Sequence, residues 1–229
     1  MTIRYHTDLI QGSEEWHAAR CGLLTASEMG SILTPTLKPA KNDKSRAHVW
    51  EILAQRISGY VEPTYQGYDM LRGQEDEILA RDLYARSYAP VRQVGFVTND
   101  EWGFTLGYSP DGLVGDDGLI EAKSRKQRFQ VETIVAYAER GETPIDFALQ
   151  IQTGLLVTKR NWCDLLSYSG GLPMVAMRVE KHPDMQAAIL TAAKAFEDDV
   201  AEKRAIWDAA QQSGLRLQPT PRRVEEEMR

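Results

Sequence analysis

The stretch Gly107–Arg128, GYSPDGLVGDDGLIEAKSRKQR, constrains the fold more than any other part of the chain. Trp102–Tyr108 alternates enough to be predicted as a strand, and the Ser-Pro-Asp-Gly sequence that follows it is typical of a turn. A second turn, rich in glycine and aspartate, precedes the apolar pair Leu119-Ile120 and then Glu121-Ala122-Lys123. The stretch therefore predicts two strands joined by tight turns, with Asp111 at the end of the first strand.

Strand geometry predicts that three of these side chains share one face. Residues two apart on a strand point the same way, so Glu121 and Lys123 lie together, and Asp111 joins them if the two strands pair. Close carboxylates repel each other, and burial increases the repulsion, so such a pair typically holds a divalent cation. Oxygen ligands favour Mg²⁺ or Mn²⁺, and such an ion can take oxygens of the substrate phosphate as its remaining ligands. The pattern predicts metal-assisted phosphodiester hydrolysis, in which Lys123 orients or deprotonates the attacking water.

The same spacing has a simpler interpretation, a β-hairpin with a Pro-Asp-Gly turn and a solvated Glu/Lys pair. However, Pro110-Asp111, nine further residues and Glu121-Ala122-Lys123 resemble the signature of the PD-(D/E)xK nucleases. The resemblance implies that Asp111, Glu121 and the carbonyl of Ala122 bind one or two Mg²⁺ or Mn²⁺ ions. It also implies a catalytic role for Lys123.

Length and composition indicate one domain. With 229 residues, 42% of them hydrophobic, the chain can bury a substantial core. We expect a single domain over residues 1–213 and a tail over residues 214–229, where two prolines and mixed charge follow a glycine. Two cysteines, Cys21 and Cys163, fit no metal-ligand pattern and favour a reducing compartment. Without an export signal or a run of about 18 apolar residues, we expect a soluble cytoplasmic protein.

The net charge of −6 argues against a general nucleic-acid coat but not against an enzyme that concentrates its cations locally. A basic run is by default a solvated face. The loop over residues 34–44 contains Lys41 and Lys44, which are candidate contacts with a DNA backbone. A second basic cluster, with Arg125 and Arg128, follows directly after the predicted metal ligands, where phosphates would pass.

The N-terminal region predicts a second anion site. Residues 14–20 form a helical pattern, and Thr25-Ala26-Ser27-Glu28 is a capping-box sequence ahead of another helix. The free N–H groups of that helix and the charge of Arg20 would suit an anion. Spacing alone, however, favours a plain helix cap at Thr25 and a surface position for Arg20.

Motifs spread along the chain resemble the phage lambda exonuclease (YqaJ-like) family. Residues 15–28, EWHAARCGLLTASE, resemble its N-terminal motif, which implies that Arg20 and Ser27 contact substrate phosphate, including the terminal 5′-phosphate. A Gly-x-x-x-Glu pattern implies that Glu77 faces the metal site, and a Gln-x-Gln pattern implies the same of Gln150. Met70 aligns with a family residue that wedges between the DNA strands, although simple packing also explains it.

Alternating helices and strands around a hairpin favour an α/β fold with a mixed central sheet, and the resemblance narrows this to a restriction-endonuclease-like core flanked by helices. We expect helices near residues 69–86 and 183–212. On the first, the apolar side chains expected to point inward are Leu71, Ile78, Leu79 and Leu83. On the second, the expected inward side chains are Ile189, Phe196, Val200 and Trp207.

The resemblance implies a Mg²⁺-dependent exonuclease that degrades double-stranded DNA from 5′ to 3′ and leaves 3′ overhangs for phage-type recombination. It further implies a ring-shaped homotrimer, a single-strand annealing protein as partner, and a phage or prophage protein in a bacterial host. Two alternatives remain open. An endonuclease of the same superfamily would share the catalytic residues but cut closed circular DNA, and a catalytically silent DNA clamp would cut nothing.

Overall fold

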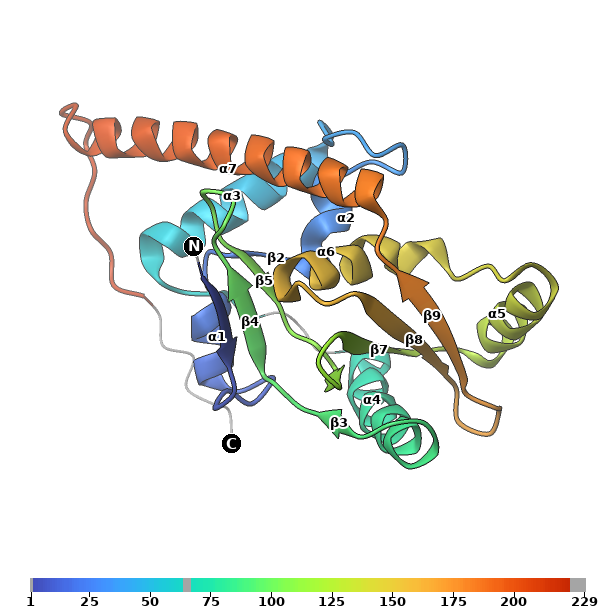
Figure 1. Ribbon diagram of the computed structural model, residues 1–229. Coiled ribbons are helices and arrows are strands. Elements are labelled where there is room, and N and C mark those ends of the chain that lie inside the picture. Colours follow the sequence, from blue (N-terminus) through green and yellow to red (C-terminus); the bar gives the residue numbers. More distant parts are fainter. Residues whose placement is uncertain (1, 64–66, 223–229) are drawn as a thin grey trace.

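The computed structural model of the protein describes residues 2–63 and 67–222, and Figure 1 labels its elements. The strands are β1 (Ile3–His6), β2 (Leu24–Thr25), β3 (Val91–Arg92), β4 (Phe96–Asn99), β5 (Leu106–Tyr108), β6 (Gly112–Val114), β7 (Gly118–Ser124), β8 (Trp162–Tyr168) and β9 (Val175–Glu180). The helices are α1 (Glu14–Arg20), η1 (Ala26–Glu28), α2 (Met29–Ile32), α3 (Asp43–Ser58), α4 (Tyr68–Ser87), α5 (Gln127–Arg140), η2 (Ile145–Phe147), α6 (Ala148–Thr158) and α7 (Pro183–Gln211).

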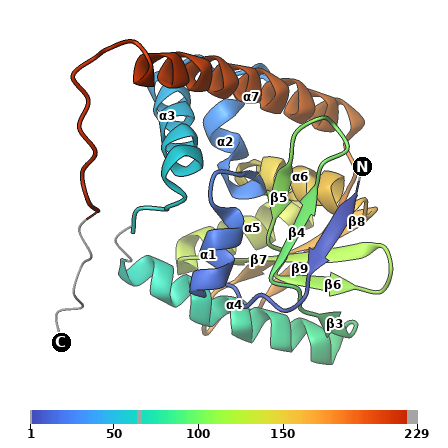
Figure 2. The same ribbon diagram turned by 90° about the vertical axis from the view of Figure 1, so that its left-hand side faces the viewer.

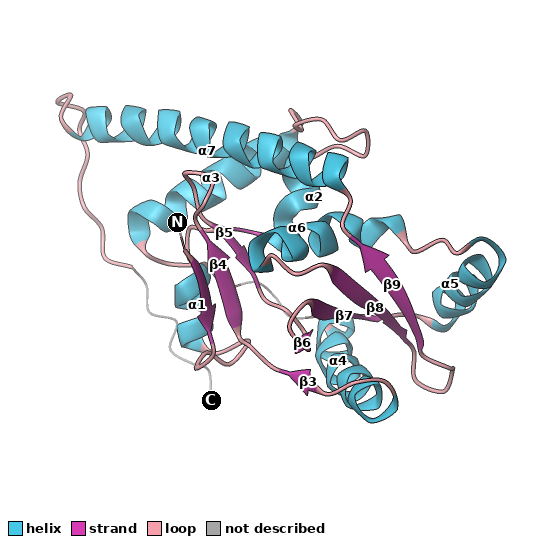
Figure 3. Cartoon of the chain, in the orientation of Figure 1, coloured by secondary structure: helices cyan, strands magenta, loops and turns pink. Residues whose placement is uncertain are grey.

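The strands form two mixed sheets, shown in magenta in Figure 3. One has the order β1-β4-β5-β2, with β2 parallel to β5, and the other has the order β3-β6-β7-β8-β9, with β7 parallel to β8. All other neighbouring strands are antiparallel. Helices flank both sheets, which confirms the predicted α/β fold with mixed sheets.

The hairpin that carries the predicted metal ligands consists of β6 and β7. Gly112 pairs with Ile120 and Val114 with Gly118, and the turn between the strands places Gly115 at φ 51°, where glycine is favoured. The predicted pairing of Trp102–Tyr108 with the second strand is wrong. Only Leu106–Tyr108 of that run is a strand, and β5 pairs with β4 and β2 in the other sheet. Asp111 reaches the site because it immediately precedes β6.

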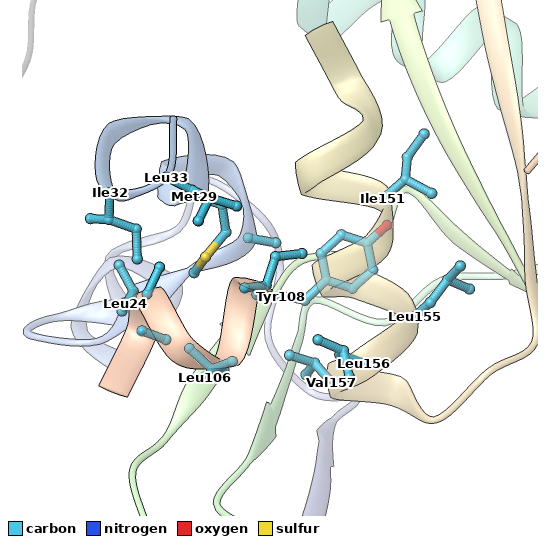
Figure 4. Close-up of a cluster of buried hydrophobic side chains, with 14 of the residues drawn as sticks. Leu24, Met29, Ile32, Leu33, Leu106, Tyr108, Ile151, Leu155, Leu156 and Val157 are labelled. Carbon is cyan, nitrogen blue, oxygen red and sulfur yellow. The ribbon is translucent and has the colours of Figure 1, made fainter. Parts of the chain in front are cut away.

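The main core lies around α6, which joins the two sheets. From Ile151 to Thr158 every residue of α6 is buried, since the helix is apolar on most of its surface. Figure 4 shows side chains of α6 beside Tyr108 of β5 and side chains of the N-terminal segment. The helix α7 crosses one end of the molecule and buries Ile189, Phe196 and Val200. The predicted burial of Trp207 is wrong, because this side chain is 45% exposed.

The helix α4 runs along the other end of the molecule and packs on β7, as Figure 2 shows. Its predicted inward face is wrong: Leu71, Ile78 and Leu79 are each about half exposed. The buried positions are Ala80 and Tyr84. Helical periodicity identifies an apolar stripe but not what covers it, and here the side that faces the sheet is the one with a small residue and a hydrogen-bonded tyrosine.

The remaining features concern the two ends of the described chain, the cysteines and the helices. The strand β1, which the polar N-terminal sequence did not predict, pairs with β4. After α7 ends at Gln211, residues 212–222 contain no helix or strand, while the domain boundary at residue 213 stays a prediction. Cys21 and Cys163 are free thiols. Within the ranges the structure describes, no helix has both the length and the apolar character that a membrane crossing needs.

Candidate active site

A pocket of about 240 Å³ lies between the β6–β7 hairpin, α6 and the N-terminal segment. Eight of the residues predicted from the sequence line it: Arg20, Ser27, Glu77, Asp111, Glu121, Ala122, Lys123 and Gln150. These residues are up to 130 positions apart in the chain, and α1, α4, β7 and α6 bring them together. The pocket therefore joins the predicted hydrolytic residues to the predicted phosphate site.

The carboxylates at the centre of the pocket carry unfavourable electrostatics. Asp111 and Glu121 are buried, and Asp111 Oδ2 accepts a hydrogen bond of 2.6 Å from the backbone N–H of Ala122. Burial raises the pKa of Asp111 well above its usual value, and the charges of Glu121 and Glu77 raise it further. A cation bound between these groups would remove the cost of ionising Asp111.

Three donors hold the carboxylate of Glu121. Tyr108 donates its hydroxyl to Oε2 at 2.7 Å, while Gln150 Nε2 donates to Oε1 at 2.5 Å and Lys123 Nζ lies 2.9 Å from the same oxygen. Lys123 also donates to Gln150 Oε1 at 2.9 Å. Burial alone would lower the pKa of Lys123, but the charge of Glu121 and the hydrogen bond with it raise that pKa above its ordinary value. Lys123 is therefore an ammonium ion fixed toward the pocket.

Glu77 reaches the edge of the pocket from α4. Its Oε1 accepts from Arg81 Nη1 at 3.0 Å, and the same nitrogen donates to the backbone oxygen of Asp111 at 3.3 Å. Burial raises the pKa of Glu77, with Arg81 opposing and Glu121 adding to the shift. Glu77 and Arg81 thus connect α4 to the turn that carries Asp111. Sequence analysis did not identify Arg81, because an arginine four residues after a glutamate is common on any exposed helix.

The phosphate side of the pocket is built around Arg20. Its guanidinium donates to Ser109 Oγ at 3.2 Å and to Thr25 Oγ1 at 3.1 Å, and lies 4.3 Å from the centre of the Trp16 ring. Thr25 caps the following turn, since Glu28 Oε2 accepts from both its N–H and its hydroxyl at 2.7 Å. No described carboxylate forms an ion pair with Arg20, so its charge is available to an anion in the pocket.

The donor set fits a hard divalent cation. Two buried carboxylates and the Ala122 carbonyl would offer oxygen ligands, and Mg²⁺ or Mn²⁺ typically takes its remaining ligands from water and phosphate. In residues 2–63 and 67–222, no three His, Cys, Asp or Glu side chains gather closely enough to form a metal cage of their own. The raised pKa of Asp111 also indicates that the pocket needs positive charge. These features suit Mg²⁺ and not a structural zinc site.

The comparison with protein families now decides the identity. The model of the YqaJ-like viral recombinase domain matches residues 15–161, which include every residue of this pocket that was predicted from the sequence. The chain belongs to the YqaJ-like viral recombinase family. Comparison with curated protein sequences gave no match for this YqaJ-like chain.

Solved structures agree with the family assignment. The alkaline exonuclease LHK-Exo from Laribacter hongkongensis is 32% identical, with a TM-score of 0.76 over 88% of this chain and 100% of its own. The complex of LHK-Exo with dAMP matches over the same shares at 33% identity, also with a TM-score of 0.76. A phage-related exonuclease from Haemophilus somnus 129PT, at 12% identity and a TM-score of 0.55 over 80% of this chain and 96% of its own, shares the fold. The predicted restriction-endonuclease-like core is thereby confirmed.

Four residues of the predicted phosphate- and DNA-binding set of this YqaJ-like domain, Thr25, Lys41, Lys44 and Met70, do not line the pocket. Thr25 contacts it indirectly, because its hydroxyl accepts a hydrogen bond from Arg20. Lys41 precedes α3 and borders a separate groove beneath α7, Lys44 lies in the first turn of α3, and Met70 is half exposed in the first turn of α4. Sequence reasoning in turn missed Tyr108 and Ser109, which do line it. Both flank the Pro-Asp motif, but their side chains are common in strands and turns, so the sequence carried no specific signal for them.

Proposed function

We propose that this chain is a Mg²⁺-dependent exonuclease that degrades double-stranded DNA from 5′ to 3′ and leaves 3′ overhangs for recombination by strand annealing. The observation that carries the proposal is that Asp111, Glu121 and Lys123 line the same pocket as the guanidinium of Arg20. Membership of the YqaJ-like family and the likeness to the alkaline exonuclease LHK-Exo support a nuclease.

Different residues of the chain have different roles in the proposed hydrolysis. Mg²⁺ or Mn²⁺, as one or two ions held by Asp111, Glu121 and the Ala122 carbonyl, would supply Lewis-acid activation of phosphate and water. Lys123, as an ammonium ion, orients the attacking water and offsets the negative charge that develops on the phosphate. Gln150 keeps Lys123 and Glu121 in place through its two hydrogen bonds. Glu77 adds negative charge at the edge of the pocket, where Arg81 restrains it.

Arg20 and Ser27 bind the terminal 5′-phosphate in this proposal. A guanidinium offers paired donors to phosphate oxygens, and the Ser27 hydroxyl adds another donor on the same side of the pocket. Because the phosphate site and the hydrolytic site share about 240 Å³, the bond that is cut lies close to the DNA end. Mononucleotides are then the product, in line with the dAMP found in the complex of the relative LHK-Exo.

Alternating cations and aromatic rings lead away from Lys123 and support the path of the DNA backbone. The Phe147 ring centre lies 5.2 Å from Lys123 Nζ and 5.4 Å from the Arg125 guanidinium, and the Phe129 ring contacts Arg125 and Arg128. Neither arginine forms an ion pair with a described carboxylate, whereas Lys126 between them pairs with Asp69 at 3.2 Å. Unpaired cations in a chain of net charge −6 suit phosphates that continue from the pocket.

The remaining DNA contacts and the assembly are also part of the proposal. Lys41 and Lys44 would touch the backbone beyond the pocket, and Met70 would meet the end of the duplex from the start of α4. We further propose a ring-shaped homotrimer, a single-strand annealing protein as partner, and action in the cytoplasm of a bacterial host as a phage or prophage protein. The half-exposed apolar side chains of α4 support an association surface.

Digestion of three DNA substrates in Mg²⁺ tests the proposal. Two are linear duplexes that carry a 5′-phosphate or a 5′-hydroxyl on one strand, and the third is a closed circle. We expect mononucleotide release from the phosphorylated strand and an intact circle. Cutting of the circle would identify an endonuclease of the same superfamily, and no cutting of any substrate would identify a silent DNA clamp.

A further inference from the structure

Glu121 is held by a residue from the other sheet. Tyr108 ends β5 of the four-stranded sheet, whereas Glu121 lies in β7 of the five-stranded sheet, so their hydrogen bond of 2.7 Å connects the sheets at the pocket. Both side chains are buried. Figure 4 shows the Tyr108 ring among buried side chains next to α6. The catalytic carboxylate is thus restrained from outside its own sheet.

The two oxygens of Glu121 have different partners. Lys123 and Gln150 both contact Oε1, whereas Tyr108 is the single hydrogen-bond donor to Oε2 among the described residues. The terminal torsion of a glutamate has a broad, roughly two-fold energy profile, so a carboxylate held at one oxygen can still rotate. The Tyr108 hydroxyl therefore determines the plane of the carboxylate that faces the metal site.

The position of the Tyr108 ring depends on a glycine in α6. A Cβ atom at Gly154 would lie 2.7 Å from Cε1 and from Cζ of the ring, closer than real Cβ atoms approach other atoms. Glycine is unfavourable inside a helix compared with alanine, so its presence there calls for a reason. The space that it leaves for Tyr108 supplies that reason.

We propose that Tyr108 is a positioning residue for the metal centre: its hydroxyl fixes the Glu121 carboxylate in the orientation that binds the cation, and Gly154 provides the room that the ring needs. The inference rests on the proposed function, since it presupposes a metal bound by Glu121. It assigns Tyr108 no contact with DNA. Loss of the hydroxyl should therefore weaken metal binding and leave DNA affinity unchanged.

The test compares Tyr108→Phe with Tyr84→Phe. Tyr84 is equally buried and donates to Asp164 Oδ2 at 2.6 Å, but it does not line the pocket, so it is a matched control for the loss of one phenol–carboxylate bond. Mn²⁺ binding to the full chain without DNA is measured by titration calorimetry. We expect the dissociation constant to rise roughly tenfold or more in Tyr108→Phe and to stay within about twofold of wild type in Tyr84→Phe.

Each outcome has a separate meaning. A selective loss in Tyr108→Phe, with DNA affinity in Ca²⁺ unchanged and activity restored by excess Mn²⁺, supports the positioning role. Wild-type affinity in Tyr108→Phe, or an equal loss in both variants, overturns it while the nuclease proposal stands. A wild-type chain that binds no Mn²⁺ overturns the proposed function, and the positioning role with it.

Discussion

Asp111→Asn should make the metal-free protein more stable although it removes a carboxylate that the proposed hydrolysis requires. The wild-type carboxylate is buried near Glu121 and Glu77, and both burial and these charges raise its pKa. Asparagine has the same shape, and its side-chain oxygen can still accept the hydrogen bond from the N–H of Ala122. The substitution therefore removes the cost of a buried charge and retains most of the local geometry.

The sign of the pH dependence follows from the raised pKa. Below the unfolded pKa of about 3.9, Asp111 is protonated in both states and costs nothing. As pH rises, the unfolded chain ionises first, so the wild type loses stability until the pH passes the folded pKa. Replacing buried charge by a neutral group gains about 1–4 kcal/mol, and weakening a charged hydrogen bond costs about 1 kcal/mol. The net gain is then about 0–3 kcal/mol, and a gain of about 1–2 kcal/mol, near the middle of this range, corresponds to a melting temperature about 2–8 °C higher.

Scanning calorimetry at pH 8 and pH 4, in EDTA and in Mg²⁺, measures these differences. In EDTA at pH 8 we expect Asp111→Asn to melt above wild type, and at pH 4 the difference should shrink toward zero. Mg²⁺ at 100 times its dissociation constant should stabilise the wild type alone, by about 2.7 kcal/mol. A variant that melts below wild type in EDTA at pH 8 would refute the reasoning, because the Ala122 hydrogen bond would then outweigh the charge cost.

Asp164→Asn is the matched control for this prediction. Asp164 and Asp111 are both 7% exposed, but Asp164 pairs with Arg178 at 2.5 Å and accepts from Tyr84 at 2.6 Å. Its charge is compensated, so we expect Asp164→Asn to lower the melting temperature in EDTA. Opposite shifts in two equally buried aspartates would separate the effect of an unpaired charge from that of burial itself.

Further substitutions test other parts of the site. Lys123→Ala should reduce kcat roughly 100-fold or more and leave DNA binding in Ca²⁺ intact, and an unchanged rate would exclude its assigned role. Arg20→Gln should remove one charged contact to phosphate, so cleavage of the 5′-phosphorylated strand should fall roughly 10–100-fold toward that of the 5′-hydroxyl strand. Gly154→Ala should lower the melting temperature because overpacking costs about 1–3 kcal/mol. Gly73→Ala, with no atom within 4 Å of the new Cβ, should raise the melting temperature. A higher melting temperature for Gly154→Ala would contradict the inference that Gly154 makes room for the Tyr108 ring.

The sequence predicted best those features of the site that depend on residues close together in the chain. The turn glycines and the alternation of residues 119–123 predicted the strand that carries Glu121 and Lys123 on one face, because side-chain alternation along a strand is a local property. The partner strand was wrong, since pairing between distant segments depends on packing that periodicity does not encode. Asp111 lies at the site because it immediately precedes β6. With three residues, β6 is too short to show a strand pattern in the sequence.

The helix α4 shows where prediction from periodicity failed. Its apolar stripe predicted an inward face, yet Leu71, Ile78 and Leu79 point outward, while Ala80 and Tyr84 face the sheet. A stripe of this kind has the same appearance whether its own domain or another molecule covers it. Glu77 nevertheless lines the pocket, and its prediction came from a family motif and not from the stripe. Its role at a metal site stays a prediction.

The contrast between Asp111 and Asp164 supports the proposal that the pocket, and not another polar cluster, is the functional site. Both aspartates are buried to the same degree, and sequence alone does not distinguish them. Asp164 has an arginine and a tyrosine that satisfy its charge, so its burial is explained within the fold. Asp111 has one backbone donor, and the charge of Lys123 only partly offsets its burial and the two neighbouring carboxylates, so the pKa of Asp111 stays raised. Strained electrostatics of this kind are typical of functional sites, and the Arg20 guanidinium in the same pocket supports the proposal that a cation binds there together with phosphate.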